Sequence, residues 1–186
     1  MKAGAFFLSK RVEHPVDSGG MAQTNEFRNA KRRLKRHLDR IAEVDEEVAE
    51  ALVTLGYPEP RLRERGFVTF LNIIISQQIS TSAARAIRGR VFDLMPEVSA
   101  RAFLKVEATR FREAGLSARK VEYATGLAEA TIEGRFTPDR LSDLDDEEAI
   151  EHIVSLRGFG RWSAEIYLMF SLGRRDVFPA DDLALL

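Results

Sequence analysis

The chain has 186 residues, a formal net charge of −1 and no cysteine. A chain of this length can bury a core of its own, so we expect a single domain or one built from two small lobes. The lack of cysteine excludes disulfides, thiolate metal sites, iron–sulfur clusters and a cysteine nucleophile. No apolar run approaches the length of a membrane span and residues 1–20 lack a secretory signal, which predicts a cytoplasmic protein without a membrane partner.

The charge is distributed unevenly along the chain. Residues 1–140 carry 24 basic against 19 acidic side chains, whereas residues 141–186 carry 4 against 10. This asymmetry leaves room for a basic face beside an acidic site. It is compatible with a nucleic-acid partner but does not identify one.

The first third of the chain predicts an extension followed by two helices. Residues 1–22 show little periodicity and are expected to be a loose extension, with Met21 as an alternative start. From residue 24, apolar positions at three- and four-residue steps indicate an amphipathic helix with a basic outer face. A second helix is expected to begin after Asp45 and to end at Gly56. Its inward positions are expected to be Val48, Leu52 and Leu55.

The middle of the chain predicts further helices and no sheet. Residues 67–75 are apolar on nearly every face, which favours a buried helix, although periodicity alone also allows a strand. Ser80 is expected to cap the next helix. More helices are expected over residues 99–113, 117–132 and 145–155, the last with Asp145 and Glu148 at capping-box spacing. Because no alternation of period two is present, we predict an all-α fold.

The segment Leu156–Ala164 is the most specific stretch in the sequence. Two glycines, Gly158 and Gly160, separate a helix that ends near residue 156 from a new amphipathic helix over residues 161–170. Gly158 can take a positive φ after a helix, and Gly160 leaves the backbone bare at the start of the next. Bare amides at a helix N-terminus bind phosphate without reading sequence. The same pair of glycines can also be a plain tight turn.

The segment Leu156–Ala164 resembles the Leu-x-Gly-x-Gly-x-x-x-Ala pattern of the helix-hairpin-helix DNA glycosylase superfamily. Segments 75–84, 114–120 and 176–183 resemble, in the same order, its bacterial 3-methyladenine DNA glycosylase II branch. The resemblance implies a helical bundle of two small lobes, with the helix-hairpin-helix motif and a catalytic cleft between the lobes, over residues 23–186. Family members continue beyond the equivalent of residue 186, so we expect a chain truncated at its C-terminus.

The resemblance implies that Asp182 is the catalytic carboxylate. An alkylated purine carries positive charge and is already a good leaving group, so one carboxylate that steadies the sugar cation and orients or deprotonates water can suffice. Ordinary glycosidases differ because they use two carboxylates. An Asp-Asp pair before an apolar stretch can also cap a helix, and capping is the expected role of Asp181.

Two further positions receive roles from the resemblance. Trp162 stands where bifunctional relatives carry a Schiff-base lysine, which implies a monofunctional enzyme, and its indole can stack on a cationic base. Gln78, with Gln77 beside it, matches the position that fills the gap left by a flipped nucleotide. The alternatives are a core tryptophan and two glutamines that leave a helix for solvent.

The resemblance also implies contacts to DNA and a cation. The hairpin residues expected to contact a strand are Gly158, Phe159, Gly160, Arg161 and Ser163, and Arg119 and Lys120 are expected phosphate partners. The backbone carbonyls of Val154, Leu156 and Phe159 match positions that hold a structural monovalent cation. No other cofactor is expected, and the protein is expected to be a monomer.

The resemblance thus implies base-excision repair of double-stranded DNA, by hydrolysis of the N-glycosidic bond of flipped alkylated purines such as 3-methyladenine and 7-methylguanine. Two alternatives stay open: a non-catalytic DNA-binding module, and a glycosylase of the same superfamily for mismatched or oxidised bases. A helical protein-interaction scaffold is a third, but it would not need the spacing of Gly158, Gly160 and Asp182. The preferred base is not encoded in any one segment.

Overall fold

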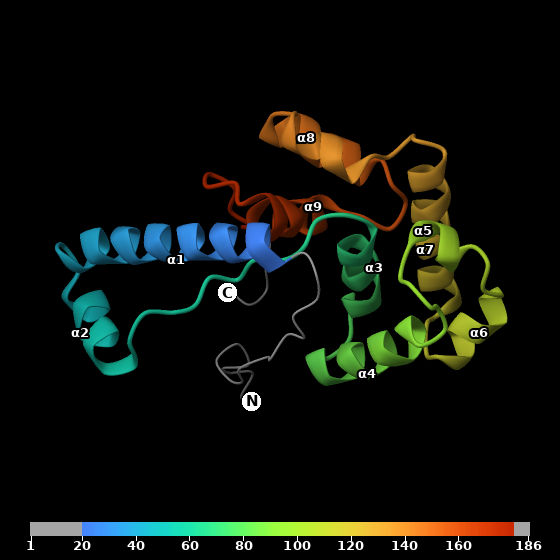
Figure 1. Ribbon diagram of the computed structural model, residues 1–186, viewed down its shortest axis with the longest axis horizontal. Helices are drawn as coiled ribbons and strands as arrows, with labels where there is room; N and C mark the ends of the chain where they lie inside the picture. The colour runs from blue at the N-terminus through green and yellow to red at the C-terminus, as the bar shows by residue number, and fades with distance from the viewer. Residues whose placement is uncertain (1–19, 181–186) are drawn as a thin grey trace. The chain divides into compact units, whose positions relative to one another are not determined.

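The computed structural model describes residues 20–180, and every regular element in that range is a helix (Figure 1). The all-α prediction is therefore confirmed. The chain divides into two compact units, Met1–Pro60 and Arg61–Leu186, where the sequence led us to expect one domain from residue 23. Among the described residues, none of the helices combines the length and the apolar character needed to cross a membrane.

Unit 1 is a pair of helices, α1 (Gly20–Ala42) and α2 (Glu46–Leu55), which contact one another through a short connection (Figure 1). Because α1 begins at Gly20, residues 20–22 are helical and do not belong to the expected loose extension. The expected cap is present, since the Val48 N–H donates to Asp45 Oδ1 at 3.0 Å. The inward position expected for Leu55 was wrong: this side chain is 79% exposed, and α2 has no buried residue.

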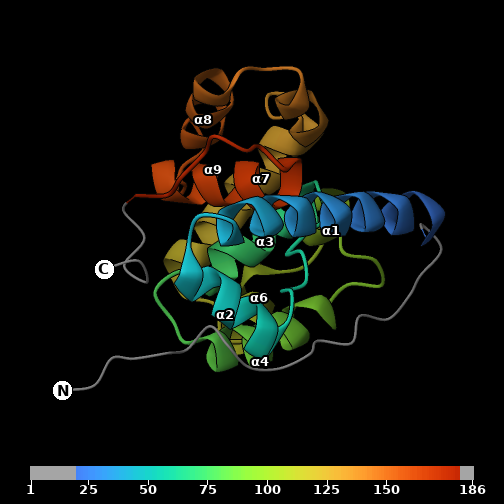
Figure 2. The ribbon, with the colours of Figure 1, turned by 90° about the vertical axis from the view of Figure 1, so that its left-hand side faces the viewer.

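Unit 2 holds the remaining elements. They are α3 (Phe67–Ser76), α4 (Thr81–Phe92), α5 (Ala100–Phe103), α6 (Ala108–Glu113), α7 (Ala118–Ile132), the 3₁₀ turn η1 (Pro138–Ser142), α8 (Asp146–Val154), α9 (Arg161–Tyr167) and the π turn η2 (Leu168–Leu172). Helix α3 packs against α4 and α7, and α8 packs against α9. Within this unit α8 lies at one end and α4 with α6 at the other (Figure 1, Figure 2).

The core of unit 2 is built around α3. Phe70 is fully buried, and its ring contacts the rings of Phe136, Phe159 and Tyr167 at centroid distances of 5.0, 5.5 and 4.1 Å. Each such ring pair contributes about 0.5–1.5 kcal/mol beyond the burial of area. The buried helix predicted over residues 67–75 is confirmed. Since Phe159 lies between α8 and α9, the core itself fixes the position of that turn.

Local capping signals were accurate guides to helix starts. Ser80 accepts a hydrogen bond from the Ala83 N–H at 3.2 Å, and Ser117 accepts one from the Lys120 N–H at 3.3 Å. At the start of α8 both halves of the predicted capping box are formed between Asp145 and Glu148. Each cap satisfies amides that the first helical turn cannot pair internally.

The helix expected over residues 99–113 is in fact two helices, α5 and α6, with a break between Phe103 and Ala108. The rings of Phe103 and Phe111 are both buried and stack at 4.1 Å. In one continuous helix these residues would be about 12 Å apart along the axis, because each residue rises 1.5 Å. The packing of the two rings therefore requires the break.

The helix predicted over residues 161–170 also differs from the structure. Helix α9 ends at Tyr167 and continues as the π turn η2, which closes at Gly173 with φ +69°. Beyond it, Arg174 Nη2 donates to the carbonyl of Leu144 at 2.6 Å, and Val177 is buried in the core. These contacts anchor the segment that leads toward the C-terminal end of the described chain.

Candidate functional site

The turn between α8 and α9 has the conformation that its two glycines predict. The Phe159 N–H donates to the Leu156 carbonyl at 3.1 Å, and the Ala164 N–H donates to the Gly160 carbonyl at 3.1 Å. Gly158 has φ +96°, as predicted, whereas Gly160 has φ −107°. Helix α8 thus passes into α9 within six intervening residues, Ser155–Gly160.

The two glycines are required for different reasons. A Cβ at Gly158 would lie 2.3 Å from Cδ2 of Tyr123, and the backbone there is left-handed, so no other residue fits without displacement. A Cβ at Gly160 would meet nothing within 4 Å, and its φ suits any residue. Gly160 provides no side-chain cap to α9. Glycine at this position therefore leaves the first amides of α9 uncovered, and the fold of the protein alone does not demand it.

The loop after α3 is tied to this turn. The side-chain amide of Gln77 donates to the Gly158 carbonyl at 2.8 Å. The ammonium of Lys120 donates to the carbonyls of Ile75 and Gln77 at 2.8 and 2.7 Å, and burial lowers the pKa of Lys120. Gln77 is half-buried, whereas Gln78 is exposed. The structure thus brings the two glutamines to the turn, but it gives them different surroundings.

Arg161 is held by two carboxylates. Its guanidinium donates to Glu147 at 2.9 and 2.5 Å and to Glu165 Oε1 at 3.0 Å. The hydrogen bonds to Glu147 raise the pKa of Arg161 above its ordinary value, and the same pair lowers the pKa of Glu147. A phosphate at Arg161 would have to compete with both acids, so the DNA contact expected for this side chain stays a prediction.

The other expected hairpin contacts lie at different depths. Trp162 is 39% exposed in the first turn of α9, which leaves part of the indole accessible. Ser163 is buried, and the Phe159 ring packs against Phe70, so the core uses both side chains. A strand contact by Phe159 would therefore involve its backbone, and one by the Ser163 hydroxyl stays a prediction.

The carbonyls expected to hold a cation come from Val154, Leu156 and Phe159, around the same turn. The Leu156 carbonyl already accepts the Phe159 N–H, and a carbonyl oxygen has a second lone pair for a further ligand. These residues fit a monovalent cation in the kind of donor they offer. Within residues 20–180, no three histidine or acidic side chains gather closely enough to hold a metal ion.

The expected catalytic carboxylate, Asp182, and its neighbour Asp181 lie outside the described residues. The described chain approaches them from a fixed point, because Val177 is buried and the Ala180 N–H donates to the Phe178 carbonyl at 2.9 Å. Phe178 itself is 68% exposed.

Some residues that shape the turn had no assigned role in the sequence. Tyr123 faces Gly158, and Glu147 pairs with Arg161, but neither contact has a sequence signal, since the partners lie 35 and 14 positions apart. The Arg161–Glu165 pair has the i, i+4 spacing of helical ion pairs and was detectable from sequence. Lys120 was expected at a phosphate and instead donates to two carbonyls of its own chain.

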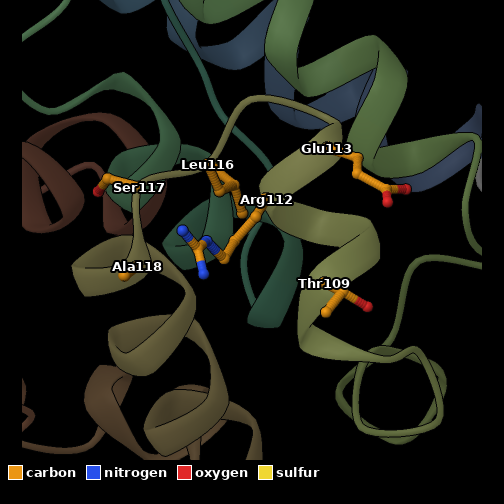
Figure 3. A pocket seen from close by; sticks show the side chains of 6 residues that line it. All are labelled: Thr109, Arg112, Glu113, Leu116, Ser117 and Ala118. Atoms are coloured by element: carbon orange, nitrogen blue, oxygen red, sulfur yellow. The ribbon is translucent and has the colours of Figure 1, made fainter.

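A shallow depression lies at another turn, between α6 and α7. Its volume is about 470 Å³, and it is lined by Thr109, Arg112, Glu113, Leu116, Ser117 and Ala118. Figure 3 shows Arg112 extending into the space between the two helices, with Glu113 on the other side of α6. None of these lining residues was among the predicted site residues, so the depression is distinct from the α8–α9 turn.

Comparison with known proteins gives the chain relatives with one kind of name. The family described as "HhH-GPD superfamily base excision DNA repair protein" matches residues 71–186, which lie within unit 2. The DNA-3-methyladenine glycosylase 1 of Schizosaccharomyces pombe is 35% identical over 127 residues, which are 66% of this chain and 56% of the relative. The DNA-3-methyladenine glycosylase of Saccharomyces cerevisiae is 33% identical over 136 residues, 68% of this chain and 46% of the relative. The chain thus spans about half the length of these curated relatives.

Solved structures resemble the fold as well. The DNA-3-methyladenine glycosidase of Bacillus halodurans has a TM-score of 0.67 at 31% identity, over 78% of this chain and 68% of the other. The 3-methyladenine DNA glycosylase of Schizosaccharomyces pombe, solved in complex with abasic DNA, has a TM-score of 0.71 at 31% identity, over 80% of this chain and 75% of the other.

Proposed function

The chain belongs to the HhH-GPD superfamily of base-excision DNA repair proteins, and we propose that it removes alkylated purines, such as 3-methyladenine and 7-methylguanine, from double-stranded DNA. The observation that carries this proposal is the α8–α9 turn, where a helix begins at a glycine that neither the backbone conformation nor the neighbouring atoms require. The names of the relatives at 33–35% identity support the same activity.

The turn offers a phosphate the groups that it needs. At the start of α9 the first amides have no side-chain cap, and the helix dipole places partial positive charge there. Without a side chain at Gly160, a strand can approach the backbone directly. Such contacts recognise the DNA backbone and not its sequence, which suits an enzyme that must examine any sequence for damage.

The proposed reaction is hydrolysis of the N-glycosidic bond. The nucleotide must first leave the base stack, at a cost of a few kcal/mol that is smaller for damaged bases. The cationic base then departs readily, and the Asp182 carboxylate steadies the oxocarbenium-like sugar and orients the attacking water. Trp162, with part of its indole exposed, is suited to stack on a cationic purine.

The same position argues for a monofunctional enzyme of the type II class. Relatives that also cleave the strand carry a lysine at the position of Trp162, and an indole cannot form a Schiff base. We further propose that the carbonyls of Val154, Leu156 and Phe159 hold a monovalent cation, which would add positive charge beside the phosphate. The protein is proposed to act as a monomer.

The test is release of free base from duplex DNA methylated in vitro, with the wild-type chain and Asp182→Asn side by side. We expect the wild type to release methylated purines and the variant to release them at least about 100-fold more slowly, the loss typical of removing one preorganised electrostatic group. Strands should break only after heating in alkali. Release that persists in Asp182→Asn contradicts the catalytic assignment, and strand cleavage without alkali contradicts the monofunctional assignment.

A binding measurement separates loss of chemistry from loss of folding. Both proteins should bind duplex DNA that contains an abasic site with the same affinity, and that affinity should fall steeply with salt as counterions are released. If both bind and neither releases base, the enzyme proposal fails and a DNA-binding module remains.

A further inference from the structure

Gln78 has an unusual backbone for its residue type. It has φ +56°, and within residues 20–180 it is the one non-glycine residue with a positive φ. Its side chain is exposed in the loop between α3 and α4. Residues with a Cβ populate this region rarely, and such conformations persist where the surrounding structure holds them in place.

Two anchors on the preceding residues hold the loop. The side chain of Gln77 donates to the Gly158 carbonyl at 2.8 Å, across 81 residues of sequence. The Gln77 carbonyl, together with that of Ile75, accepts from the Lys120 ammonium at 2.7 and 2.8 Å. Gln77 is therefore fixed by its side chain to the α8–α9 turn and by its backbone to α7. These two anchors leave Gln78 little freedom to move relative to the turn.

A lysine at the end of a helix can simply stabilise the last carbonyls, as a cation near a C-terminus often does. Two observations go beyond that role. The residue that Lys120 holds is itself bonded to the α8–α9 turn, and the strained residue that follows it projects outward from the core. A purely structural cap needs neither feature.

We propose that Lys120 and Gln77 are positioning residues that make Gln78 and the α8–α9 turn one rigid unit, so that Gln78 enters the duplex at a fixed place relative to the strand that the turn binds. This proposal rests on the proposed function. It assigns Lys120 no contact with DNA: the residue acts through the carbonyls of Ile75 and Gln77. Preorganisation matters here because a displacement of about 1 Å can cost on the order of 100-fold in rate.

The primary test measures base unstacking and does not require chemistry. A duplex with 2-aminopurine at the target position becomes fluorescent when that base leaves the stack. Wild-type protein should raise the fluorescence, and Lys120→Met and Gln77→Met should each lower the extent of the rise on the order of tenfold. Lys120→Arg, which retains donors for the two carbonyls, should recover much of it. Lys105→Met removes an exposed lysine of the same unit and serves as the charge-matched control, with no expected change.

A second measurement separates positioning from general damage. Release of a methylated purine from duplex DNA should fall in Lys120→Met, whereas release from single-stranded DNA, where the base is already unpaired, should be unchanged. Combining Lys120→Met with Gln78→Ala should add no further loss, because both changes disable one device. Unfolding midpoints by circular dichroism identify any variant that fails to fold, and the half-buried Gln77 is then the milder test.

The outcomes are distinct. Equal losses on duplex and single strand, or additive losses in the double variant, reduce Lys120 to a structural cap and overturn the proposal. So does a wild-type protein that binds DNA without unstacking the base. If the wild type unstacks the base and releases none, the positioning proposal stands and the proposed glycosylase activity fails.

Discussion

Unit 2 contains two turns that share a pattern and differ at one position. Between α6 and α7 the sequence is Gly115-Leu116-Ser117, and between α8 and α9 it is Gly158-Phe159-Gly160. Each begins with a glycine at positive φ, with 107° at Gly115 and 96° at Gly158, and continues with a buried apolar residue. Each ends with the residue that precedes a helix. At α7 that residue is a serine whose hydroxyl caps the first turn, and at α9 it is a glycine that caps nothing.

The difference teaches which turn completes the fold and which leaves an opening. The α6–α7 turn satisfies its own amides, and the depression beside it is lined by the side chains of a closed corner. The α8–α9 turn is held as firmly by its contacts, with Phe159 in the core and Tyr123 against Gly158, yet it leaves the start of α9 uncovered. Rigid placement together with uncovered amides is the combination that the proposed binding of a DNA strand requires.

The largest expected effect is on the glycine that faces Tyr123. Gly158→Ala would place a Cβ 2.3 Å from the ring in a left-handed conformation, so we expect the free energy of unfolding to fall by about 3 kcal/mol or more. Urea denaturation measures the change. Adding Tyr123→Ala should return part of the loss, because it removes the clash. A loss below about 1 kcal/mol would show that the ring moves aside freely.

At the matching glycine the expected effect is smaller. In Gly115→Ala the new Cβ would lie 3.0 Å from Arg90 Nη2 and 3.1 Å from Ile87 Cγ1, which can yield more readily than an aromatic ring. The remaining cost is the positive φ, so we expect a loss of about 1–2 kcal/mol in urea denaturation. If this variant were less stable than Gly158→Ala, the assumed difference between the two turns would be wrong.

The cap that closes the α6–α7 turn should have a modest effect on stability alone. Ser117→Ala removes the acceptor of the Lys120 N–H and is expected to cost about 1 kcal/mol. Affinity for abasic duplex DNA, measured by fluorescence anisotropy, should stay within twofold of the wild type, a range of about 0.4 kcal/mol. A larger loss of affinity would assign this turn a part in binding.

The smallest change in stability, with the opposite sign, is expected when the cap is transferred. Gly160→Ser should stabilise the protein by a few tenths of a kcal/mol in thermal unfolding. It should weaken binding to abasic duplex about tenfold, because the hydroxyl takes an amide and the side chain fills the open space. Gly160→Ala, which fills the space without a hydroxyl, should weaken binding without the gain in stability. Unchanged affinity in both variants would remove the role proposed for Gly160.

Features encoded by neighbouring residues were predictable from the sequence. The caps at Asp45, Ser80 and Asp145, and the positive φ of Gly158, follow from chemistry within four residues, and all of them are present. The uncovered start of α9 was predictable for the same reason, because it depends on the residue type at position 160.

Features that depend on distant packing were not predictable. The break between α5 and α6 arises because the rings of Phe103 and Phe111 stack, and a helical pattern cannot announce that. The roles of Gln77 and Lys120 depend on partners 81 and 43 to 45 positions away. For Lys120, charge suggested solvent or phosphate, whereas burial against carbonyls decides its contacts.

The π turn Leu168–Leu172 has a consequence for insertions and deletions in this chain. A π turn accommodates one residue more than an α-helix over the same stretch of hydrogen bonds. Deleting one residue there would restore α-helical spacing and rotate everything that follows by about 100° about the helix axis. Val177 would then leave the core, and the approach to Asp182 would start in another direction. The length of this segment is therefore constrained even where its side chains are free to vary.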